Sequence, residues 1–269
     1  KQKSELLPKV VSGELLFSYG ISEPDVGGDV ASVRTTAKIE GDEVVINGSK
    51  RWCSGPLITD YIYTLVRTGP EEERHKNLSI ILIPPSIDGI TIEPQKTLGQ
   101  KGVGGTCDVT FDNVRVPKEN ILLGEGRGFE ISQVRLGPGR IHHCMRTIGK
   151  AEVALELMVK RAGTREAFGK PIAKLGGNLE IISRARIEIN AMRLSVLQAA
   201  KAMDVLGNKE ARVYVSAIKA MVPEKACLII DQAIQMHGAA GISQWTPLAG
   251  LYTDIRHLRF ADGPDEVHH

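Results

Sequence analysis

The sequence predicts an α+β protein with a β-rich first region and a helical second region. Short runs of β-branched and aliphatic residues, separated by turn residues, fill the stretch from about Leu15 to Val116, as is typical of a β-barrel or a sandwich. After the glycine-rich segment 124–128 the apolar period changes from two residues to nearly four, which indicates amphipathic helices. We therefore expect strands to give way to helices near residue 125.

The strand candidates follow from their flanking turn residues. The clearest hairpin joins Val33–Ile39 to Val44–Ile46 through the polar residues 40–43, and Asn47 with Gly48 supplies a second turn signal. The remaining candidates are bounded by Gly, Pro, Asp or Asn, which favour turns. They are Tyr61–Val66, Leu78–Ile83, Ile90–Ile92 and Val109–Val116.

The helical region is predicted from one apolar stripe and from its end signals. Seven apolar residues are separated alternately by three and four positions, so they share one helix face and form a bundle seam: Ile182, Ala185, Ile189, Met192, Val196, Ala199 and Met203. Gly207 predicts the end of that helix, and Pro223 must kink or interrupt the next one. We expect a first long helix over Phe129–Arg161 and a final short one over Leu248–Arg256.

Composition narrows the function classes. With 42% hydrophobic and 25% charged residues, the chain of 269 residues has enough apolar material for packed cores. A formal net charge of +2 argues against a nucleic-acid or membrane footprint and favours small-molecule chemistry. The four cysteines lie far apart, so we expect reduced thiols and neither a metal site nor a disulfide framework. No apolar run can span a bilayer and no signal peptide opens the chain, so we expect an intracellular soluble protein.

Two segments of the β-rich region have the chemistry of ligand contacts. The polar loop Ile21–Asp29 contains the adjacent glycines Gly27 and Gly28, whose backbone amides can approach a ligand closely. On these residues alone, an ordinary strand connection is the favoured interpretation. Trp52, with the nearby hydroxyl of Ser54, can stack on a flat heteroaromatic cofactor and hydrogen-bond to it, although a half-buried structural Trp is common.

Two segments of the helical region carry cations. Arg165 and Phe168, between two helices, can bind a nucleotide or serve as a loop anchor with a solvated charge. On the first long helix, Arg140 and Arg146 can meet an anionic or acyl-thioester ligand, or form an ion-paired face. His142 and His143 on the same helix are adjacent, so they point in different directions and do not form a metal-binding face.

The C-terminal segment 260–268 places three carboxylates beside Gly and Pro. A buried carboxylate there can be a general base with a raised pKa. The alternative is an acidic helix start, with Asp262 or Asp265 as the cap and Glu266 favouring the helix dipole. The residues alone leave both open.

In their order along the chain, these segments resemble the acyl-CoA dehydrogenase superfamily, from about Gly13 to His268. The order carries the resemblance, and no single motif does. The segments are a Ser-Glu-Pro loop at Ser22, Trp-x-Ser at Trp52, residues 114–117 leading into 124–129, Arg165–Lys170, Gln235–Gly241 and an acidic residue before Gly263. Residues 124–149 and 261–268 look especially like the subgroup of family members 10 and 11.

The resemblance implies a fold with an N-terminal helical domain, a middle β-barrel and a C-terminal up-and-down four-helix bundle. On that basis we expect residues 1–14 to be a remnant of, or linker to, the first domain, which is absent from this chain. Residues 15–125 then form the β-barrel domain. Residues 126–269 form the helical bundle domain, with its last helix missing.

The resemblance also implies FAD as cofactor. Ser54 lies at the position whose hydroxyl contacts flavin N5, and Arg165, Phe168 and the Gln235–Ala239 turn match segments that hold the ADP part of a neighbouring subunit's FAD. Sites shared in this way imply a homodimer or a homotetramer. The implied cofactor-binding residues are Tyr19, Ile21, Ser22, Gly27, Gly28, Trp52, Cys53, Ser54, Arg165, Phe168, Gln235, Gly238, Ala239, Pro264 and Glu266.

The implied reaction is α,β-dehydrogenation of an acyl-CoA thioester to the trans-2-enoyl-CoA. Asp262 aligns with the glutamate that removes the α-proton in most members, while the β-hydrogen leaves as hydride to flavin N5. Arg140, Gly28 and Gly263 match substrate-binding positions. Some relatives place the base two residues before the matching Arg, but that position is Pro138 here. An Asp is one methylene shorter than a Glu, which affects substrate choice or rate.

The resemblance leaves the electron acceptor and the compartment open. An electron-transfer flavoprotein is the expected partner in fatty acid β-oxidation, in the cytoplasm of a bacterium or in the mitochondrial matrix or peroxisome of a eukaryote. The alternatives are an oxygen-using oxidase of the nitroalkane oxidase or acyl-CoA oxidase type, or a flavin-bearing binding protein without catalysis. Peroxide production distinguishes the oxidase, and the near-neutral charge counts against a DNA-binding relative.

Overall fold

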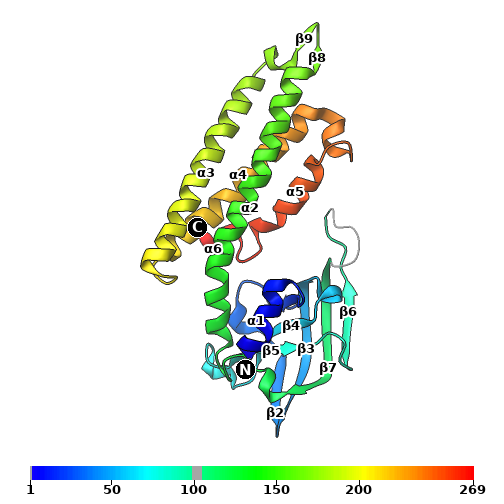
Figure 1. Ribbon diagram of the computed structural model, residues 1–269, viewed down its shortest axis with the longest axis vertical. Helices are drawn as coiled ribbons and strands as arrows, with labels where there is room; N and C mark the ends of the chain where they lie inside the picture. The colour runs from blue at the N-terminus through cyan, green and yellow to red at the C-terminus, as the bar shows by residue number, and fades with distance from the viewer. Residues whose placement is uncertain (1, 99–104) are drawn as a thin grey trace. The chain divides into compact units, whose positions relative to one another are not determined.

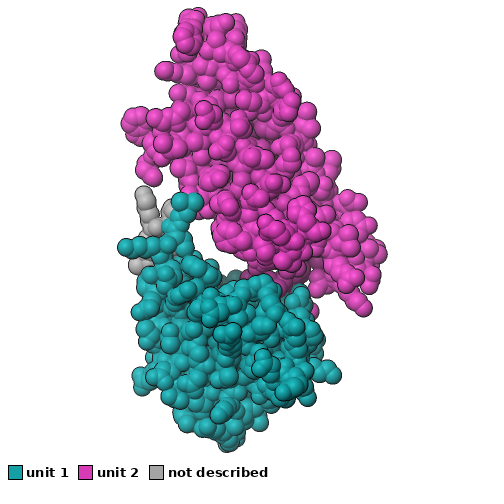
Figure 2. Space-filling model, turned by 180° about the vertical axis from the view of Figure 1, so that it is seen from behind, with its two compact units in different colours: residues 1–133 teal, residues 134–269 magenta. Residues whose placement is uncertain are grey.

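The computed structural model describes residues 2–98 and 105–269. The chain divides into two compact units, residues 1–133 (unit 1) and 134–269 (unit 2), which are coloured separately in Figure 2. The long helix α2 (Gly128–Thr164) begins in unit 1 and continues in unit 2. The predicted order, a β-rich region followed by a helical region, is confirmed (Figure 1).

The described part of unit 1 is built on a seven-stranded sheet in the order β1-β4-β2-β3-β7-β6, with β5 pairing with β4. Its longest antiparallel pair joins β3 to β7, while β1 runs parallel to β4. A helix, α1 (Gln2–Ser12), precedes the sheet and buries none of its residues. The strands are β1 (Phe17–Gly20), β2 (Thr36–Glu40), β3 (Glu43–Ser54), β4 (Tyr61–Arg67), β5 (Leu78–Ile83), β6 (Ile90–Pro94) and β7 (Thr106–Pro117).

The sheet agrees with most of the predicted strands, but the turn predicted at Asn47-Gly48 is wrong. Both residues lie inside β3, at a shift in its register with β7. Gly48 has φ of +140°, and a Cβ there would lie 2.7 Å from the Thr35 Cα. The glycine is therefore required by a close approach of two backbone segments, which a local sequence pattern does not distinguish from a turn.

The core of unit 1 lies on faces of the sheet that the strand pattern predicts. All six residues of β5 are buried, as a continuous apolar run implies. Cys53 and Cys107, opposite each other on β3 and β7, are both fully buried, and Cys53 and Phe111 belong to the core cluster. Val44, Ile46, Ile62, Ile81, Ile83, Val109, Val114 and Val116 pack with them.

Unit 2 is a bundle in which α2, α3 (Asn178–Leu206) and α4 (Arg212–His237) run alongside one another (Figure 1). The predicted stripe on α3 is confirmed, because its five central members are buried in the bundle core: Ala185, Ile189, Met192, Val196 and Ala199. The remaining elements are the hairpin β8 (Glu166–Ala167) and β9 (Lys170–Pro171), α5 (Leu248–Arg256) and α6 (Asp265–His268).

The helix ends follow the predicted signals, with one exception. Gly207 caps α3 with φ of +81°, a conformation that favours glycine. Pro223, expected to kink or interrupt its helix, is buried inside an uninterrupted α4. The surrounding packing outweighs the loss of one backbone hydrogen bond at that proline. Among the helices of residues 2–98 and 105–269, none combines the length and apolarity that crossing a bilayer requires.

Replacing either of two glycines of α2 by alanine should change the free energy of unfolding, in opposite directions. A Cβ at Gly128 would lie 2.7 Å from the backbone carbon of Ser79, so Gly128→Ala forces β5 to shift and should lower the free energy of unfolding by about 1–3 kcal/mol. Gly149 is exposed, and no other atom lies within 4 Å of the place an added methyl group would take, so Gly149→Ala should raise it by about 0.5–1 kcal/mol. Urea unfolding of both variants checks this, and equal effects would contradict the packing.

Candidate functional site

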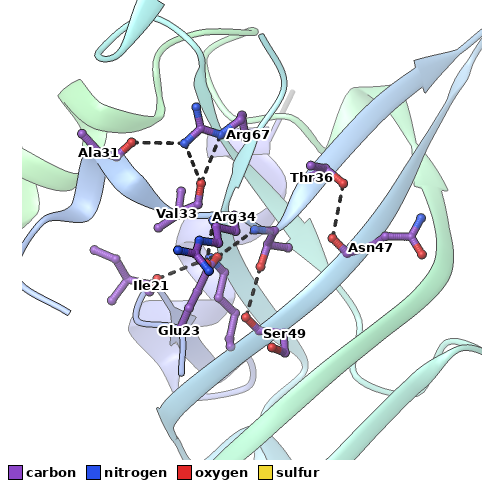
Figure 3. Close-up of polar contacts among 11 residues, drawn as sticks. Ile21, Glu23, Ala31, Val33, Arg34, Thr36, Asn47, Ser49 and Arg67 are labelled. Atoms are coloured by element: carbon purple, nitrogen blue, oxygen red, sulfur yellow. Dashed lines mark hydrogen bonds and ion pairs between the residues drawn. The ribbon is translucent and has the colours of Figure 1, made fainter. Parts of the chain in front are cut away.

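The glycine loop of unit 1 is fastened by a buried ion pair between Glu23 and Lys50. The Lys50 side chain is fully buried and that of Glu23 is 5% exposed, with 2.7 Å between Nζ and Oε1. Glu23 also accepts hydrogen bonds from the backbone N–H groups of Arg34 and Thr35, at 2.6 and 2.9 Å (Figure 3). Lys50 donates a further bond to the Ile21 carbonyl. The start of the loop therefore has a fixed position.

Both members of this pair stay ionised near neutral pH. Burial lowers the pKa of Lys50 to about 8, although the Glu23 carboxylate opposes the shift. Burial raises the pKa of Glu23, but the charge and hydrogen bond of Lys50, together with the bonds from Arg34 and Thr35, outweigh burial, so the net shift is downward. A buried charge needs this complete set of partners, because desolvation otherwise favours the neutral form.

Beyond Glu23 the loop is open to solvent. Glu23 and Val26 exchange backbone hydrogen bonds of 2.8 and 3.2 Å, which makes the turn. Gly27 and Gly28 are exposed, and no other atom lies within 4 Å of the place a Cβ would take. The backbone amides of these glycines are accessible to a ligand. Beside them is a hollow of about 160 Å³ lined by the segment 23–25, Arg34-Thr35 and Gly48-Ser49.

A β-bulge turns Trp52 outward. The register of β3 against β7 shifts between the pairs Lys50–Val109 and Cys53–Cys107, so Arg51 and Trp52 share the space opposite Asp108. Trp52 has φ of +64° and is 54% exposed. Arg51 donates two hydrogen bonds to Asp108 Oδ2, and its guanidinium lies 5.7 Å from the centre of the Trp52 ring.

The neighbours of Trp52 differ in what they offer a ligand. The Ser54 side chain is exposed, and its carbonyl accepts a hydrogen bond from Ser18 Oγ. The Cys53 side chain is fully buried and burial raises its pKa to about 12, so only the backbone of Cys53 can meet a ligand. Tyr19 stacks on Tyr63 at 4.3 Å, with its hydroxyl 2.8 Å from Ser132 Oγ. The Ser22 carbonyl accepts a bond from the Arg51 N–H.

In unit 2, Phe168 stands at the tip of the β8–β9 hairpin. Phe168 and Gly169 form its two-residue turn with φ of +51° and +72°, as in a type I′ turn. Phe168 is 94% exposed, and Arg165 is exposed at the base of the hairpin. A bulky residue rarely adopts positive φ, so this presentation of an aromatic ring is unusual.

The end of α4 carries the other residues that the resemblance links to the ADP part of FAD. Gln235 lines a hollow of about 260 Å³ between α4, α3 and the segment around Ile172. Gly238 caps the helix with φ of +62°, and the following Ala239 is exposed. His237 is buried, with Nδ1 2.7 Å from the Ala233 carbonyl, so its ring faces the helix.

Asp262 lies in a loop of unit 2 among cations of α2. Its carboxyl is 14% exposed, with Oδ2 3.1 Å from His143 Nε2 and Oδ1 3.5 Å from an Arg135 nitrogen. The His143 contact has the distance of an ion pair but not the direction of a regular hydrogen bond. Arg140 donates from Nε to the Asp262 carbonyl at 2.9 Å. Asp262 and Gly263 have φ of +56° and +106°, which aims the carboxyl at α2.

The expected raised pKa of this carboxylate is wrong for Asp262. Burial raises its pKa, but the contact with His143 and the charges of Arg135 and Arg140 together outweigh burial, so the pKa lies below its ordinary value. The sequence pattern did not place these three side chains around the loop. The Asp262 carboxyl is therefore ionised at neutral pH.

Lys219 of α4 also fixes the backbone of the Asp262 loop. The Lys219 side chain is fully buried, and Nζ donates to the carbonyls of Leu258 at 2.6 Å and Gly263 at 3.0 Å. Burial lowers the pKa of Lys219. Sequence reasoning missed Lys219 and Lys50. Lys219 lies inside an apolar run, which is the signal that could have found it, whereas Lys50 follows the polar residues 47–49 and gives no such signal.

The other two carboxylates of this tail have different surroundings. Asp265 is buried and accepts a 2.7 Å hydrogen bond from Arg259, while Glu266 is exposed. The prediction that Asp262 or Asp265 caps a helix is wrong, because α6 begins at Asp265 after Pro264 with no side-chain cap. Glu266 does lie in the first turn of α6. Asp262 alone among the three faces the cations of α2.

Comparisons with known proteins match both units. Family models match residues 18–114, as the acyl-CoA dehydrogenase middle domain, and residues 126–269, as the acyl-CoA dehydrogenase C-terminal domain. The whole chain is 48% identical to mouse acyl-CoA dehydrogenase family member 10 and 43% identical to mouse family member 11. The chain spans 26% and 35% of the lengths of these relatives. It also resembles butyryl-CoA dehydrogenase from Megasphaera elsdenii, with a TM-score of 0.90 and 27% identity over 99% of this chain and 69% of that one.

Removing Lys50 should destabilise unit 1 severely. Lys50→Met leaves the buried Glu23 carboxylate unpaired, and we expect the free energy of unfolding to fall by about 3–5 kcal/mol. Adding Glu23→Gln removes the unpaired charge, so the double variant should recover part of the loss. Guanidinium unfolding of both variants gives the double-mutant cycle. A Lys50→Met variant of wild-type stability would contradict the assigned pair.

Removing Lys219 should loosen the Asp262 loop. Lys219→Met deprives two carbonyl groups of a charged donor, and we expect a loss of about 2–4 kcal/mol in the free energy of unfolding. Lys225→Met is the matched control on α4, because Lys225 is 40% exposed and pairs with Glu188 at the surface. That change should lower stability by less than about 1 kcal/mol. Calorimetric scans that rank the two variants equally would contradict this role.

Proposed function

The chain belongs to the acyl-CoA dehydrogenase family, and we propose that it supplies the FAD-binding and catalytic part of an enzyme that dehydrogenates an acyl-CoA between Cα and Cβ. Members of this family are FAD-dependent oxidoreductases, and fatty acid β-oxidation enzymes such as butyryl-CoA dehydrogenase belong to it. Because the chain covers about a quarter to a third of the two mouse relatives, the activity of the whole protein is a proposal.

The residues of each unit fit FAD by their chemistry. Among the described residues, five non-glycine residues have positive φ, and Trp52, Phe168 and Asp262 are three of them. Such strained conformations persist where the surrounding structure holds them, and they gather at functional sites. Exposed aromatic rings at Trp52 and Phe168 suit stacking on the flat rings of a flavin and an adenine, and the open amides of Gly27 and Gly28 suit an anion.

In this proposal, residues of both units hold the cofactor. Unit 1 contributes Tyr19, the loop from Ile21 to Gly28 and the segment Trp52–Ser54, where the Cys53 contact is through its backbone. Unit 2 contributes Arg165, Phe168, the Gln235–Ala239 turn, Pro264 and Glu266. Because Arg165, Phe168 and the Gln235–Ala239 turn serve the FAD of a second copy in this proposal, the active form is a homodimer or a homotetramer.

Asp262 carries the proposal, because its geometry is that of a proton acceptor. The cations of α2 keep its carboxylate ionised, and the Lys219 bonds on either side fix the loop. Asp262 takes the α-proton of the acyl thioester, and the electron pair of the broken C–H bond forms the α,β double bond as the β-hydrogen departs as hydride. When bound, FAD supplies the acceptor for that hydride at flavin N5.

The neighbours of Asp262 position the substrate in the proposed reaction. Arg140, whose Nε fixes the Asp262 carbonyl, has the charge to attract the acyl-CoA, and Gly263 leaves room beside the base. Gly28 serves the same substrate from unit 1. The product is the trans-2-enoyl-CoA, and the reduced enzyme passes its electrons to an acceptor such as an electron-transfer flavoprotein.

Asp262→Asn should abolish the reaction while the acyl-CoA still binds. In the full-length FAD-loaded protein, titrated anaerobically with a panel of acyl-CoAs, the wild type should bleach the oxidised flavin absorbance. The variant should lose at least about a thousandfold of the bleaching rate, because it keeps the shape of the side chain but cannot accept the proton. Stopped-flow absorbance measures the rate and the flavin spectral shift reports ligand binding.

Asp231→Asn is the control for this experiment, since Asp231 is an exposed aspartate of α4. It should bleach at the wild-type rate. A wild type that binds FAD but bleaches with no acyl-CoA would sink the proposed function in favour of a binding protein. Peroxide formed in air without an added acceptor would instead assign the chain to the oxidases of this superfamily.

A further inference from the structure

Arg146, His143 and Asp262 form a line of contacts that the reaction scheme does not use. Arg146 and His143 lie on α2, one helical turn apart, and Asp262 lies in the loop before α6, all within unit 2. A guanidinium nitrogen of Arg146 is 2.8 Å from His143 Nδ1, and His143 Nε2 is 3.1 Å from Asp262 Oδ2. The imidazole thus touches a cation with one nitrogen and an anion with the other.

The contact with Arg146 fixes the protonation of His143. A guanidinium only donates hydrogen bonds, so His143 Nδ1 must accept and carries no proton. The ring is therefore neutral, and its single proton is on Nε2, the nitrogen that faces Asp262. A proton on Nδ1 would point at the guanidinium 2.8 Å away, so the contact favours the Nε2–H tautomer.

We propose that His143, held in its Nε2–H tautomer by Arg146, is a positioning residue that orients the Asp262 carboxylate for proton abstraction. The inference rests on the proposed function, because it takes Asp262 as the base. His143 acts through Asp262 and does not itself take the substrate proton.

The burial of the two carboxyl oxygens supports this orientation. Asp262 Oδ2 is buried and has no regular hydrogen-bond partner among the described residues, and His143 Nε2, 3.1 Å away, is its polar neighbour. The Asp262 side chain is 14% exposed, and Oδ1 lies 3.5 Å from the half-exposed Arg135. His143 thus fixes the inner oxygen, and Oδ1 is the oxygen that accepts the α-proton. An Asp is shorter than a Glu, so its reach depends more strongly on the orientation of its carboxyl group.

Other titratable and charged groups surround the pair and remain unchanged in the variants below. On α2 they are Arg135 and Arg140, on α4 Lys219, and on the C-terminal segment His257, Asp265 and His268. Because all of them persist when His143 alone is replaced, a difference between variant and wild type reports the imidazole.

The tautomer is tested directly by long-range ¹H–¹⁵N NMR of the histidine rings in the full-length FAD-loaded protein. His143→Gln assigns the resonance. We expect a ring whose proton is on Nε2 and whose Nδ1 carries none. Arg146→Met should release this restraint and let the Nδ1–H tautomer appear. A His143 that is protonated at neutral pH, or neutral with its proton on Nδ1, would overturn the proposal.

The functional role is tested by the pH dependence of kcat/KM with an acyl-CoA that the wild type dehydrogenates. His143→Leu removes a donor that lowers the pKa of Asp262, so that pKa rises and a higher pH is needed to ionise the base. The acidic limb should therefore move up by about one pH unit. With the carboxylate misaligned, kcat should fall about tenfold to a hundredfold while KM changes by less than about threefold.

Two variants separate positioning from a general structural effect. His143→Gln keeps an N–H donor. It should restore most of kcat, and the acidic limb of its kcat/KM profile should lie close to the wild-type position. His142→Leu, at the exposed neighbouring histidine, should leave both unchanged. An acidic limb of His143→Leu at the wild-type position, or a kcat of His143→Gln as low as that of His143→Leu, would overturn the proposal. If Asp262→Asn kept wild-type activity, the proposed function would fail instead. The NMR measurement of the His143 tautomer would still test the contacts among Arg146, His143 and Asp262.

Discussion

The buried lysine ammonium group is the constraint on which both functional loops depend. Lys50 in unit 1 and Lys219 in unit 2 are both fully buried, and each ends on backbone carbonyls of a loop that carries candidate ligand contacts. An ammonium taken out of water must be satisfied by oxygens at fixed positions, or it loses its charge. The loops therefore cannot rearrange without leaving the ammonium unsatisfied. In this way a charge in the core gives an irregular segment the rigidity that a strand or helix has from its own hydrogen bonds.

Rigid loops also permit the strained conformations that present the functional side chains. Trp52 and Asp262 both have positive φ. Trp52 lies two residues after the buried Lys50, which pairs with Glu23. Asp262 directly precedes Gly263, whose carbonyl accepts a hydrogen bond from the buried Lys219. Positive φ at a residue with a Cβ costs about 1–3 kcal/mol, so it survives only where neighbouring contacts determine the backbone. At Trp52 those contacts include the β-bulge and the Arg51–Asp108 pair, and at Asp262 they include the Arg140 bond to its carbonyl.

The sequence predicted the parts of the structure that follow from local periodicity. The strand Leu78–Ile83 has the predicted bounds, and the stripe of α3 is buried, because apolar spacing directly encodes which face meets a core. The prediction failed where contacts distant in sequence decide. Asn47 and Gly48 have the composition of a turn, but Thr35 and β7 place them inside a strand. The order of the motifs, rather than any one of them, correctly indicated the family.

At the candidate site, too, local patterns singled out residues, and contacts distant in sequence decided their surroundings. Asp262 was singled out because a carboxylate beside Gly and Pro is conspicuous in the sequence. The expectation that its pKa is raised was wrong. The side chains that lower its pKa come from α2, which is far away along the chain. Adjacent histidines were correctly expected to diverge, yet the pattern could not tell that His143 faces Asp262 while His142 is exposed. Spacing fixes directions around one helix axis, and the partners found in those directions depend on the tertiary fold.

The low pKa of Asp262 limits how such a base can work. A carboxylate stabilised by cations is reliably ionised but is a weak proton acceptor, whereas catalysis favours a pKa nearer the working pH. Burial opposes the cations at this residue and is its largest single influence, so the two effects compete. An acyl thioester that excludes water from the carboxyl strengthens the burial effect and weakens hydration of the ionised form. In the proposed reaction, binding of the substrate thus raises the basicity of Asp262 at the moment when the α-proton is within reach, while the resting protein keeps the group ionised.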